Sequence, residues 1–523
     1  MKKNLLLAAF CGGMVVLTGC APTVAEIVEM HNKDLVAGKF DTSMPHMQEL
    51  IKDDEDNSHE DTPMWRLMVS NAKMLTGDTK AIEEFDAAED IILKNDKKDK
   101  AEKAKDYVKS MLINDKYLTF DPGFQDRMFF SLDKALMYIE KGNCDAGRTE
   151  LNRMMQYQEF WLKKRQEEIK ASENAMKESL KPEEKSDLPK PVADQINNLK
   201  KEVEKVYTDL INSDNVLGLI TKNIGFDLKN NPDISKLKPE DYQNAYATHF
   251  CGVVRMLNRD GGTDYLKDAA VLKAQSTVVK NDYELATNNK VPQNKIWVYV
   301  EDGLCSIRQE TRIDLPILLV PFAGKYVKYM GLALPKLIER NVAADKYIVA
   351  DKEMEELENI DRLLKTEYNI YMADAVKRDL LRCLLKTLPQ VAAGVVKDNI
   401  GDPQVKLACS AAQYAAAGYA LSSTQADLRT WNVLPKRVMV QCVDKPADGK
   451  VVIKADAETF ELVVPQDVVC FDCKGSGKTG EGKLDCIKCK GVGKFAANNY
   501  IVWIRKVAKN SPFIHKVIAF PAK

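Results

Sequence analysis

Residues 296–320 read IWVYVEDGLCSIRQETRIDLPILLV, and this stretch separates two parts of the chain that differ in character. Its apolar residues alternate with polar ones and many are β-branched, a pattern that predicts β-strands. The residues before it follow a helical spacing, and the last hundred residues again contain strand-like segments. The sequence therefore predicts a mainly α fold with a C-terminal β-rich domain.

The part before residue 296 has the spacing of amphipathic helices, most clearly in residues 24–215. In residues 64–92 apolar positions recur every three or four residues, and Gly77-Asp78 interrupts them where one helix should end. The pattern returns at 131–155 and 242–276, which resemble tetratricopeptide-like (TPR-like) hairpins; a generic helical bundle is the alternative. Residues 162–212 are rich in charge and predict a polar excursion of long helices.

The part after residue 320 alternates between the two kinds of pattern. After Pro335 the sequence predicts helix to about residue 425, including a tightly packed core helix in the small residues of 407–421. Strands are expected at 437–443, 450–455, 458–464, 499–507 and 515–520. The tripeptide at 447–449 predicts a hairpin turn between the first two of these strands.

These patterns predict four consecutive regions. The expected regions are a signal peptide at 1–19, a helical repeat-like domain at 20–290, a mixed strand and helix core domain at 291–430, and a β-rich domain at 431–523 with a zinc-knuckle insertion at 470–494.

The segment CFDCKGSGKTGEGKLDCIKCKG, residues 470–491, has the spacing of a metal site. Its cysteines form the pattern C-x2-C-x12-C-x2-C, in which each pair can bind one ion from a tight turn; they are Cys470, Cys473, Cys486 and Cys489. Four thiolates suit one tetrahedral Zn²⁺, and a site closed by four protein ligands has a structural role by default. Thiol–disulfide chemistry is the alternative, because Cys-x-x-Cys is also a redox motif.

Each cysteine pair is followed by two glycines, Gly475 and Gly477 in the first case and Gly491 and Gly493 in the second. This Cys-x-x-Cys-x-Gly-x-Gly repeat resembles the zinc region of DnaJ-type chaperones over about 25 residues. The resemblance implies a zinc ribbon, with one ion held by two repeats. The chain lacks the His-Pro-Asp tripeptide of a J-domain, so co-chaperone activity is not implied.

The first twenty residues, MKKNLLLAAFCGGMVVLTGC, have the features of an export signal. Two lysines precede an apolar stretch that is too short to span a bilayer comfortably. The sequence Leu-Thr-Gly-Cys that ends at Cys20 resembles the lipobox of bacterial lipoproteins, which implies cleavage and acylation at Cys20. An ordinary signal peptide is the alternative. Ala21 is not the aspartate of inner-membrane retention, so the resemblance implies an outer-membrane anchor facing the periplasm.

Three further segments resemble signature blocks of a family of uncharacterised bacterial lipoproteins with a helical, repeat-like N-terminal half. The segments are EDGLCSIRQETRIDLP at 301–316, YMGLALPKL at 329–337 and ADLRTWNVLPKRVMVQ at 426–441, and the resemblance extends loosely over residues 24–445. In the last segment, Arg429 and Trp431 are candidates to clamp a neighbouring loop or to contact a partner. The family has no established chemistry, so the resemblance implies location and architecture only.

The first of these segments is also dense in charge. Its candidate site residues are Arg308, Glu310, Arg312 and Asp314, close to Glu301. An ion-pair network is the favoured interpretation, and an acid–base site of a hydrolase is the alternative. The five histidines show no metal or triad spacing, and the sequence has no phosphate-binding glycine loop.

The formal net charge of -1 gives no reason to expect nucleic acid as a partner. Taken together, the patterns predict a non-enzymatic, lipid-anchored envelope protein that binds or scaffolds a protein partner and carries one structural Zn²⁺. The competing hypotheses are a periplasmic thiol–disulfide oxidoreductase or a chaperone-like protein that uses the Cys-x-x-Cys pairs, and a hydrolase at the 301–314 cluster.

Overall fold

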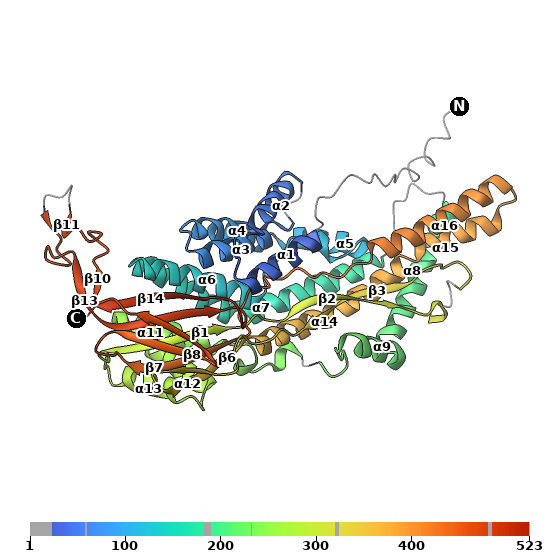
Figure 1. Ribbon diagram of the computed structural model, residues 1–523. Coiled ribbons are helices and arrows are strands. Elements are labelled where there is room, and N and C mark those ends of the chain that lie inside the picture. Colours follow the sequence, from blue (N-terminus) through green and yellow to red (C-terminus); the bar gives the residue numbers. More distant parts are fainter. Residues whose placement is uncertain are drawn as a thin grey trace.

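The computed structural model describes residues 24–57, 60–181, 190–231, 233–319, 324–479 and 484–521 of the chain (Figure 1). The predicted signal peptide and the predicted lipidation site Cys20 lie outside these residues. The chain is 54% helical and has a β-rich C-terminal region, so this level of the predicted fold class is confirmed. Among the helices of the described ranges, none combines the length and the apolarity needed to cross a bilayer.

The helices of the first half occupy most of the predicted helical ranges, and α3 ends beside the predicted break at Gly77. In order they are α1 (Val24–Ala37), α2 (Met44–Asn57), α3 (Thr62–Thr76), α4 (Ala81–Asp96), α5 (Lys100–Leu112), α6 (Phe124–Glu140), α7 (Cys144–Ser179), α8 (Lys190–Ile211), α9 (Asp214–Ile224), α10 (Pro239–Tyr242), α11 (Ala245–Asn258), α12 (Thr263–Leu272) and α13 (Thr277–Thr287), with short 3₁₀ turns at Asp115–Tyr117 and Ile234–Lys236. Helices α3 and α4 contact each other, as do α6 and α7, and α11 and α12. Their TPR-like character stays a prediction.

The second half contains the strands and three further helices. They are β1 (Lys295–Asp302), β2 (Ile307–Asp314), a 3₁₀ turn at Ile317–Leu319, β3 (Gly331–Ile338), β4 (Tyr347–Val349), β5 (Lys352–Glu353), β6 (Glu355–Asn359), α14 (Ile360–Leu385), α15 (Leu388–Asn399), α16 (Pro403–Ser423), β7 (Arg437–Asp444), β8 (Lys450–Ala455), β9 (Glu458–Val463), β10 (Asp467–Val469), β11 (Lys478–Thr479), β12 (Leu484–Asp485), β13 (Lys494–Lys506) and β14 (Phe513–Pro521).

The main sheet has six strands in the order β10-β13-β1-β7-β6, with β14 paired to β13. It joins β1, from the beginning of the second half, in parallel to β13, near the end of the chain, and antiparallel to β7. A second sheet, β5-β4-β8-β9, packs on one face of the main sheet, while helices cover the other face. The sheet is therefore the middle of three layers.

The sequence of β1 explains this layering, because its alternate residues belong to two different hydrophobic clusters. Ile296, Val298 and Val300 point into the cluster shared with the second sheet. Trp297 and Tyr299 point into the cluster shared with the helices. Because side chains alternate across a strand, a strand that is apolar at every position requires a cover on both faces.

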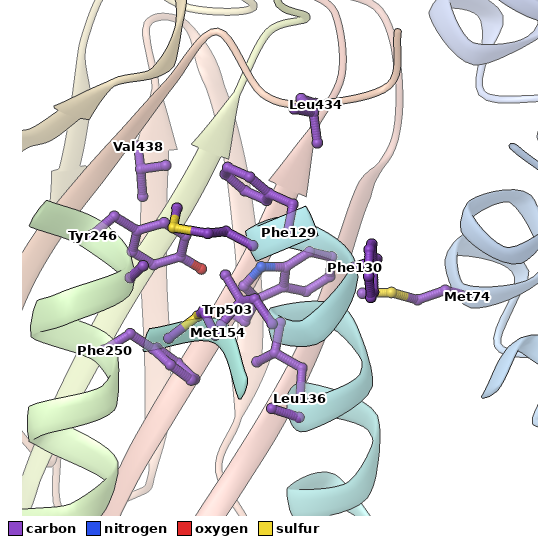
Figure 2. Close-up of a cluster of buried hydrophobic side chains, with 14 of the residues drawn as sticks. Met74, Phe129, Phe130, Leu136, Met154, Tyr246, Phe250, Leu434, Val438 and Trp503 are labelled. Atoms are coloured by element: carbon purple, nitrogen blue, oxygen red, sulfur yellow. The ribbon is translucent and has the colours of Figure 1, made fainter. Parts of the chain in front are cut away.

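Figure 2 shows part of the helix-side cluster. Phe129 and Phe130 of α6 lie beside Trp503 of β13, and Tyr246 and Phe250 of α11 approach from the adjacent helix. Two polar groups buried in this layer share one acceptor: the Tyr246 hydroxyl and the Trp503 indole N–H donate to Glu301, at 3.0 and 2.8 Å. Aromatic area and paired polar groups together fix the helices on the sheet.

Three sequence-based expectations for the second half are wrong. Residues 335–359 contain the end of β3 and the strands β4 to β6 where helix was predicted, and helix begins only at α14. The turn at 447–449 does not close a hairpin, because β7 pairs with β1 and β6 whereas β8 pairs with β4 and β9. Helix α16 is not a core helix: small residues such as Ala417 and Ala420 are buried, but Leu407 and Tyr414 are exposed, and Figure 1 shows the α15–α16 pair at the end of the molecule opposite the sheet.

A buried lysine of α6 anchors the helical layer, which gives a first prediction. Lys134 is 2% exposed and its Nζ lies 2.9 Å from Glu89 and 3.0 Å from Glu150, both nearly buried. We expect Lys134→Ala to lower the free energy of unfolding by about 3 kcal/mol, because it removes one of the two cations, beside Arg153, that pair with these buried carboxylates. Urea denaturation followed by circular dichroism measures this.

Lys33→Ala is the matched control, because Lys33 pairs with Glu29 at 2.8 Å on the surface, where the side chains are 73% and 65% exposed. Its loss should change the stability by less than about 0.5 kcal/mol. Equal effects of the two substitutions would contradict the role assigned to Lys134.

Candidate metal centre

The four predicted ligand cysteines lie on a unit that leaves the main sheet between β10 and β13. These two strands pair antiparallel through Asp467–Ala496, Val468–Phe495 and Val469–Lys494, and the chain between them continues outward as two tight turns and the short β11–β12 hairpin. Figure 1 shows the unit projecting from the sheet end of the molecule. We call residues 470–479 and 484–494 the cysteine unit.

The cysteine unit brings all four sulfur atoms together. Their positions lie within 4.8 Å of one another, and all four side chains are buried. Cys470 Sγ is 3.8 Å from Cys486 Sγ, and Cys473 Sγ is 3.6 Å from Cys489 Sγ. A tetrahedral ion with Zn–S bonds of about 2.3 Å places its sulfurs roughly 3.8 Å apart, whereas a disulfide needs about 2.05 Å. The geometry therefore fits one four-thiolate metal ion.

The two Cys-x-x-Cys turns have the same local structure. The N–H of Gly477 donates to Cys473 Sγ at 3.3 Å, and the N–H of Gly493 donates to Cys489 Sγ at 3.1 Å. The turns are also joined to each other, because Cys470 N donates to Gly493 O and Cys486 N to Gly477 O, both at 2.8 Å. Such N–H···S bonds orient thiolate ligands and disperse their charge.

Two glycines are required by the close approach of these turns. Gly477 and Gly493 have φ of 72° and 83°, in the left-handed region. A β-carbon would lie 2.1 Å from Gly491 O in the first case and 2.3 Å from Gly475 O in the second. Any side chain at either position would separate the two turns and, with them, the two ligand pairs.

The electrostatics of the unit favour ionised sulfur at some positions. Burial favours the neutral thiol of Cys473, but the Gly477 N–H and the neighbouring cysteines lower its pKa to about 7. Burial raises the pKa of Cys470 to about 12 in the absence of an ion. Lysines on the surface of the unit would offset the charge of a four-thiolate ion; those in the described residues are Lys474, Lys478, Lys488, Lys490 and Lys494.

The other candidate residues are distributed over three places. Glu310 accepts the Ala426 N–H and the Arg312 Nε–H, both at 2.9 Å, so these two lie in a surface pair on β2. Asp314 is exposed at the end of β2, opposite Gly331. Glu301 belongs to the buried layer described above, so the dense charge of residues 301–314 does not form one cluster.

Arg429 and Trp431 join the last segment to the helical half. Arg429 forms two 2.8 Å bonds with Asp427 and donates to the backbone oxygens of Asp115 and Leu118, at 3.0 and 2.8 Å. Trp431 is buried and donates to Leu67 O of α3 at 3.1 Å. Both side chains therefore hold segments that are more than three hundred residues away in the sequence.

Arg308, Arg429 and Trp431 also line a cavity of about 530 Å³, which sequence reasoning did not reveal. Two of the acidic residues that line the cavity, Asp126 at the start of α6 and Glu367 on α14, have strongly raised pKa values. Burial raises the pKa of Asp126 to about 7 and that of Glu367 to about 8. No sequence signal could have paired them, because each is an ordinary acidic residue in a helical segment.

The comparisons with known proteins add no identity. No protein-family model matches the chain, and neither the curated proteins nor the solved structures give a match. The resemblances to a lipoprotein family and to the DnaJ-type zinc region therefore stay predictions, while the clustering of four cysteines at metal-binding distance is established by the geometry.

The geometry predicts one metal ion per chain. Purified protein should contain one equivalent of zinc by plasma mass spectrometry and should show four additional reactive thiols after chelation. Cys489→Ser should lower the zinc content at least tenfold, because it removes one of four ligands. Cys442→Ser is the control: Cys442 is half-buried on β7, and the variant should keep the metal. Absence of zinc together with two disulfides would contradict the assignment.

The raised pKa values of Asp126 and Glu367 predict that the stability of the fold depends on pH. Their folded pKa values, about 7 and 8, lie above the ordinary 3.8 and 4.5, so protonation stabilises the fold and this contribution is lost as the pH rises through 7 and 8. Between pH 6 and pH 9 the native protein should lose about 3 kcal/mol more than the Asp126→Asn/Glu367→Gln variant. Urea denaturation at both pH values measures this, and equal losses would refute it.

Proposed function

We propose that the chain is a lipid-anchored binding or scaffolding protein of the bacterial envelope, in which the cysteine unit is closed around one structural Zn²⁺ and presents a rigid projection to a protein partner. Support for a structural ion comes from the four buried sulfurs, which occupy all positions of a tetrahedral site and leave none for a substrate. The cysteine unit has little core of its own apart from the four cysteines and Phe495. An ion is therefore the main source of its stability.

The observation that carries the binding role is the surface of the cysteine unit. Large apolar side chains stand exposed among its lysines and at its edge; they are Val469, Phe471, Leu484, Ile487 and Val492, with Ile487 91% exposed. Exposed apolar side chains gathered on a small unit mark interaction surfaces, and basic residues between them favour an acidic or mixed partner surface.

A photo-crosslinking amino acid at position 487 tests this role in detergent-solubilised envelopes. We expect one defined protein adduct at 487 and none at Val463, which is also exposed, at 66%, but lies on β9 outside the cysteine unit. Ile487→Ser should weaken binding of the identified partner at least tenfold while the zinc content stays unchanged. An adduct of equal yield at 463, or undiminished binding by Ile487→Ser, would contradict the proposal.

The membrane anchor is tested separately at Cys20. Cys20→Ala should move the protein from the membrane fraction to the soluble fraction, since acylation requires that thiol.

The thiol–disulfide alternative has its own outcome: a Cys470→Ser/Cys489→Ser variant that keeps its fold but loses disulfide reductase activity would support it, whereas loss of fold in the cysteine unit supports structural zinc.

A further inference from the structure

The cavity near Arg308 shares no lining residue with the cysteine unit. Its walls come from the segment before α6, from α7 and α14, from β2 and from the turn that contains Arg429. Its volume of about 530 Å³ lies in the range of small-molecule sites. Aromatic rings provide much of the wall, including Tyr157, Trp161, Tyr368, Tyr371 and Trp431.

Arg308 is the chemically distinctive residue of this cavity. Its guanidinium carbon lies 4.8 Å from the centre of the Tyr371 ring, and its side chain has no hydrogen bond or ion pair with any described residue. The neighbouring guanidinium groups are all paired: Arg127 with Asp96 at 2.7 Å, Arg378 with Asp115 at 2.6 Å and Arg429 with Asp427 at 2.8 Å. An unpaired guanidinium beside an aromatic wall has the donors to take a carboxylate with two parallel bonds.

Asp126 and Glu367 stand on either side of Gly123 in the same cavity. Asp126 Oδ2 accepts the Gly123 N–H at 3.0 Å, and Glu367 Oε1 accepts the Gln125 N–H at 2.9 Å. A β-carbon at Gly123 would lie 2.6 Å from Glu367 Oε2 and 3.6 Å from Asp126 Oδ2, so the carboxyl groups are close neighbours. The hydrogen bonds of both carboxyl groups with the described residues come from backbone N–H groups, and neither has a side-chain partner there.

The charges that face this pair come from several elements. Arg308 of β2 acts on both carboxyl groups, and Arg127 of α6 and Asp121 of the preceding loop act on Asp126. Arg127 and Asp121 are themselves ion-paired. Asp427, which also faces Arg308, is held by Arg429. Below pH 7 both carboxyl groups are mostly protonated, so neither of them then neutralises the positive charge of Arg308.

We propose that this cavity binds a small organic acid, whose carboxylate pairs with Arg308, whose ring packs against the aromatic wall, and whose other oxygens accept hydrogen bonds from the carboxyl groups of Asp126 and Glu367. The site is separate from the metal centre and does not depend on the function proposed for the cysteine unit. Two classes of ligand have these groups, sugar acids and aromatic acids, and each class has a neutral counterpart of the same shape.

Isothermal titration of the full, zinc-loaded chain at pH 6.5 tests the site with glucuronate and 4-hydroxybenzoate as probes. Glucose and 4-hydroxybenzamide are the neutral controls. We expect one of the two acids to bind at least tenfold more tightly than its neutral counterpart, and the acid that binds identifies the source. Binding of neither acid, or equal binding of the neutral counterpart, would overturn the proposal.

Variants of two arginines on one strand make the test specific to the cavity. Arg308→Gln should weaken binding of the acid at least tenfold, because it removes the guanidinium but keeps the length and polarity of the side chain. Arg312→Gln is the matched control on β2: Arg312 pairs with Glu310 outside the cavity, and its loss should leave binding unchanged. Thermal melting checks that both variants are folded. Undiminished binding by folded Arg308→Gln would contradict the assignment.

The carboxyl pair adds a second readout that a purely structural role of Arg308 would not produce. Raising the pH from 6.5 to 9 ionises Asp126 and Glu367, which removes two donors and places negative charge beside the ligand. The affinity should therefore fall at least tenfold in the native protein and by much less in Asp126→Asn/Glu367→Gln, whose side chains stay neutral. The same fall in both proteins would overturn the role of the pair.

Discussion

The architecture depends on one constraint, the burial of strand β1 on both faces. Ile296, Val298 and Val300 need an apolar cover on one side, and Trp297 and Tyr299 need another on the opposite side. The second sheet supplies the first cover and helices of the N-terminal half supply the other. Because β1 also pairs with both β7 and β13, strands from distant parts of the chain meet at it. Helices, sheet and C-terminal strands are thereby tied into one structure.

The cysteine unit lies outside these hydrophobic cores, so other interactions hold it in order. Its order comes from backbone hydrogen bonds between the two turns, from N–H···S bonds and from the convergence of four sulfurs. Phe471 links it to the helical half, because a β-carbon on Gly142, in the turn between α6 and α7, would lie 3.4 Å from Phe471 Cβ. A metal staple at this position would hold a small apolar and basic surface rigid while the body of the protein fixes its direction.

Polar contacts join the helical half to α14 and to the turn that contains Arg429. Arg429 reaches backbone oxygens of the segment before α6, and Arg378 of α14 meets Asp115 of the same segment at 2.6 Å. Buried ion pairs of this kind add little net stability, but they leave a costly unpaired charge if the segments move apart. They therefore specify one arrangement around the cavity, whose shape depends on that arrangement.

The sequence by itself determined what depends on neighbouring residues. Helical spacing predicted helix over residues 24–215 and 242–276, alternation predicted strands in residues 296–320, and the spacing of the cysteines and glycines predicted a site whose four sulfurs do converge. Tertiary structure decided what depends on distant residues. It sent β7 and β8 to different sheets, left the apolar residues of α16 exposed, and brought Asp126, Arg308 and Glu367 into one cavity. Local patterns report which face of an element is apolar, but not which other element will cover it.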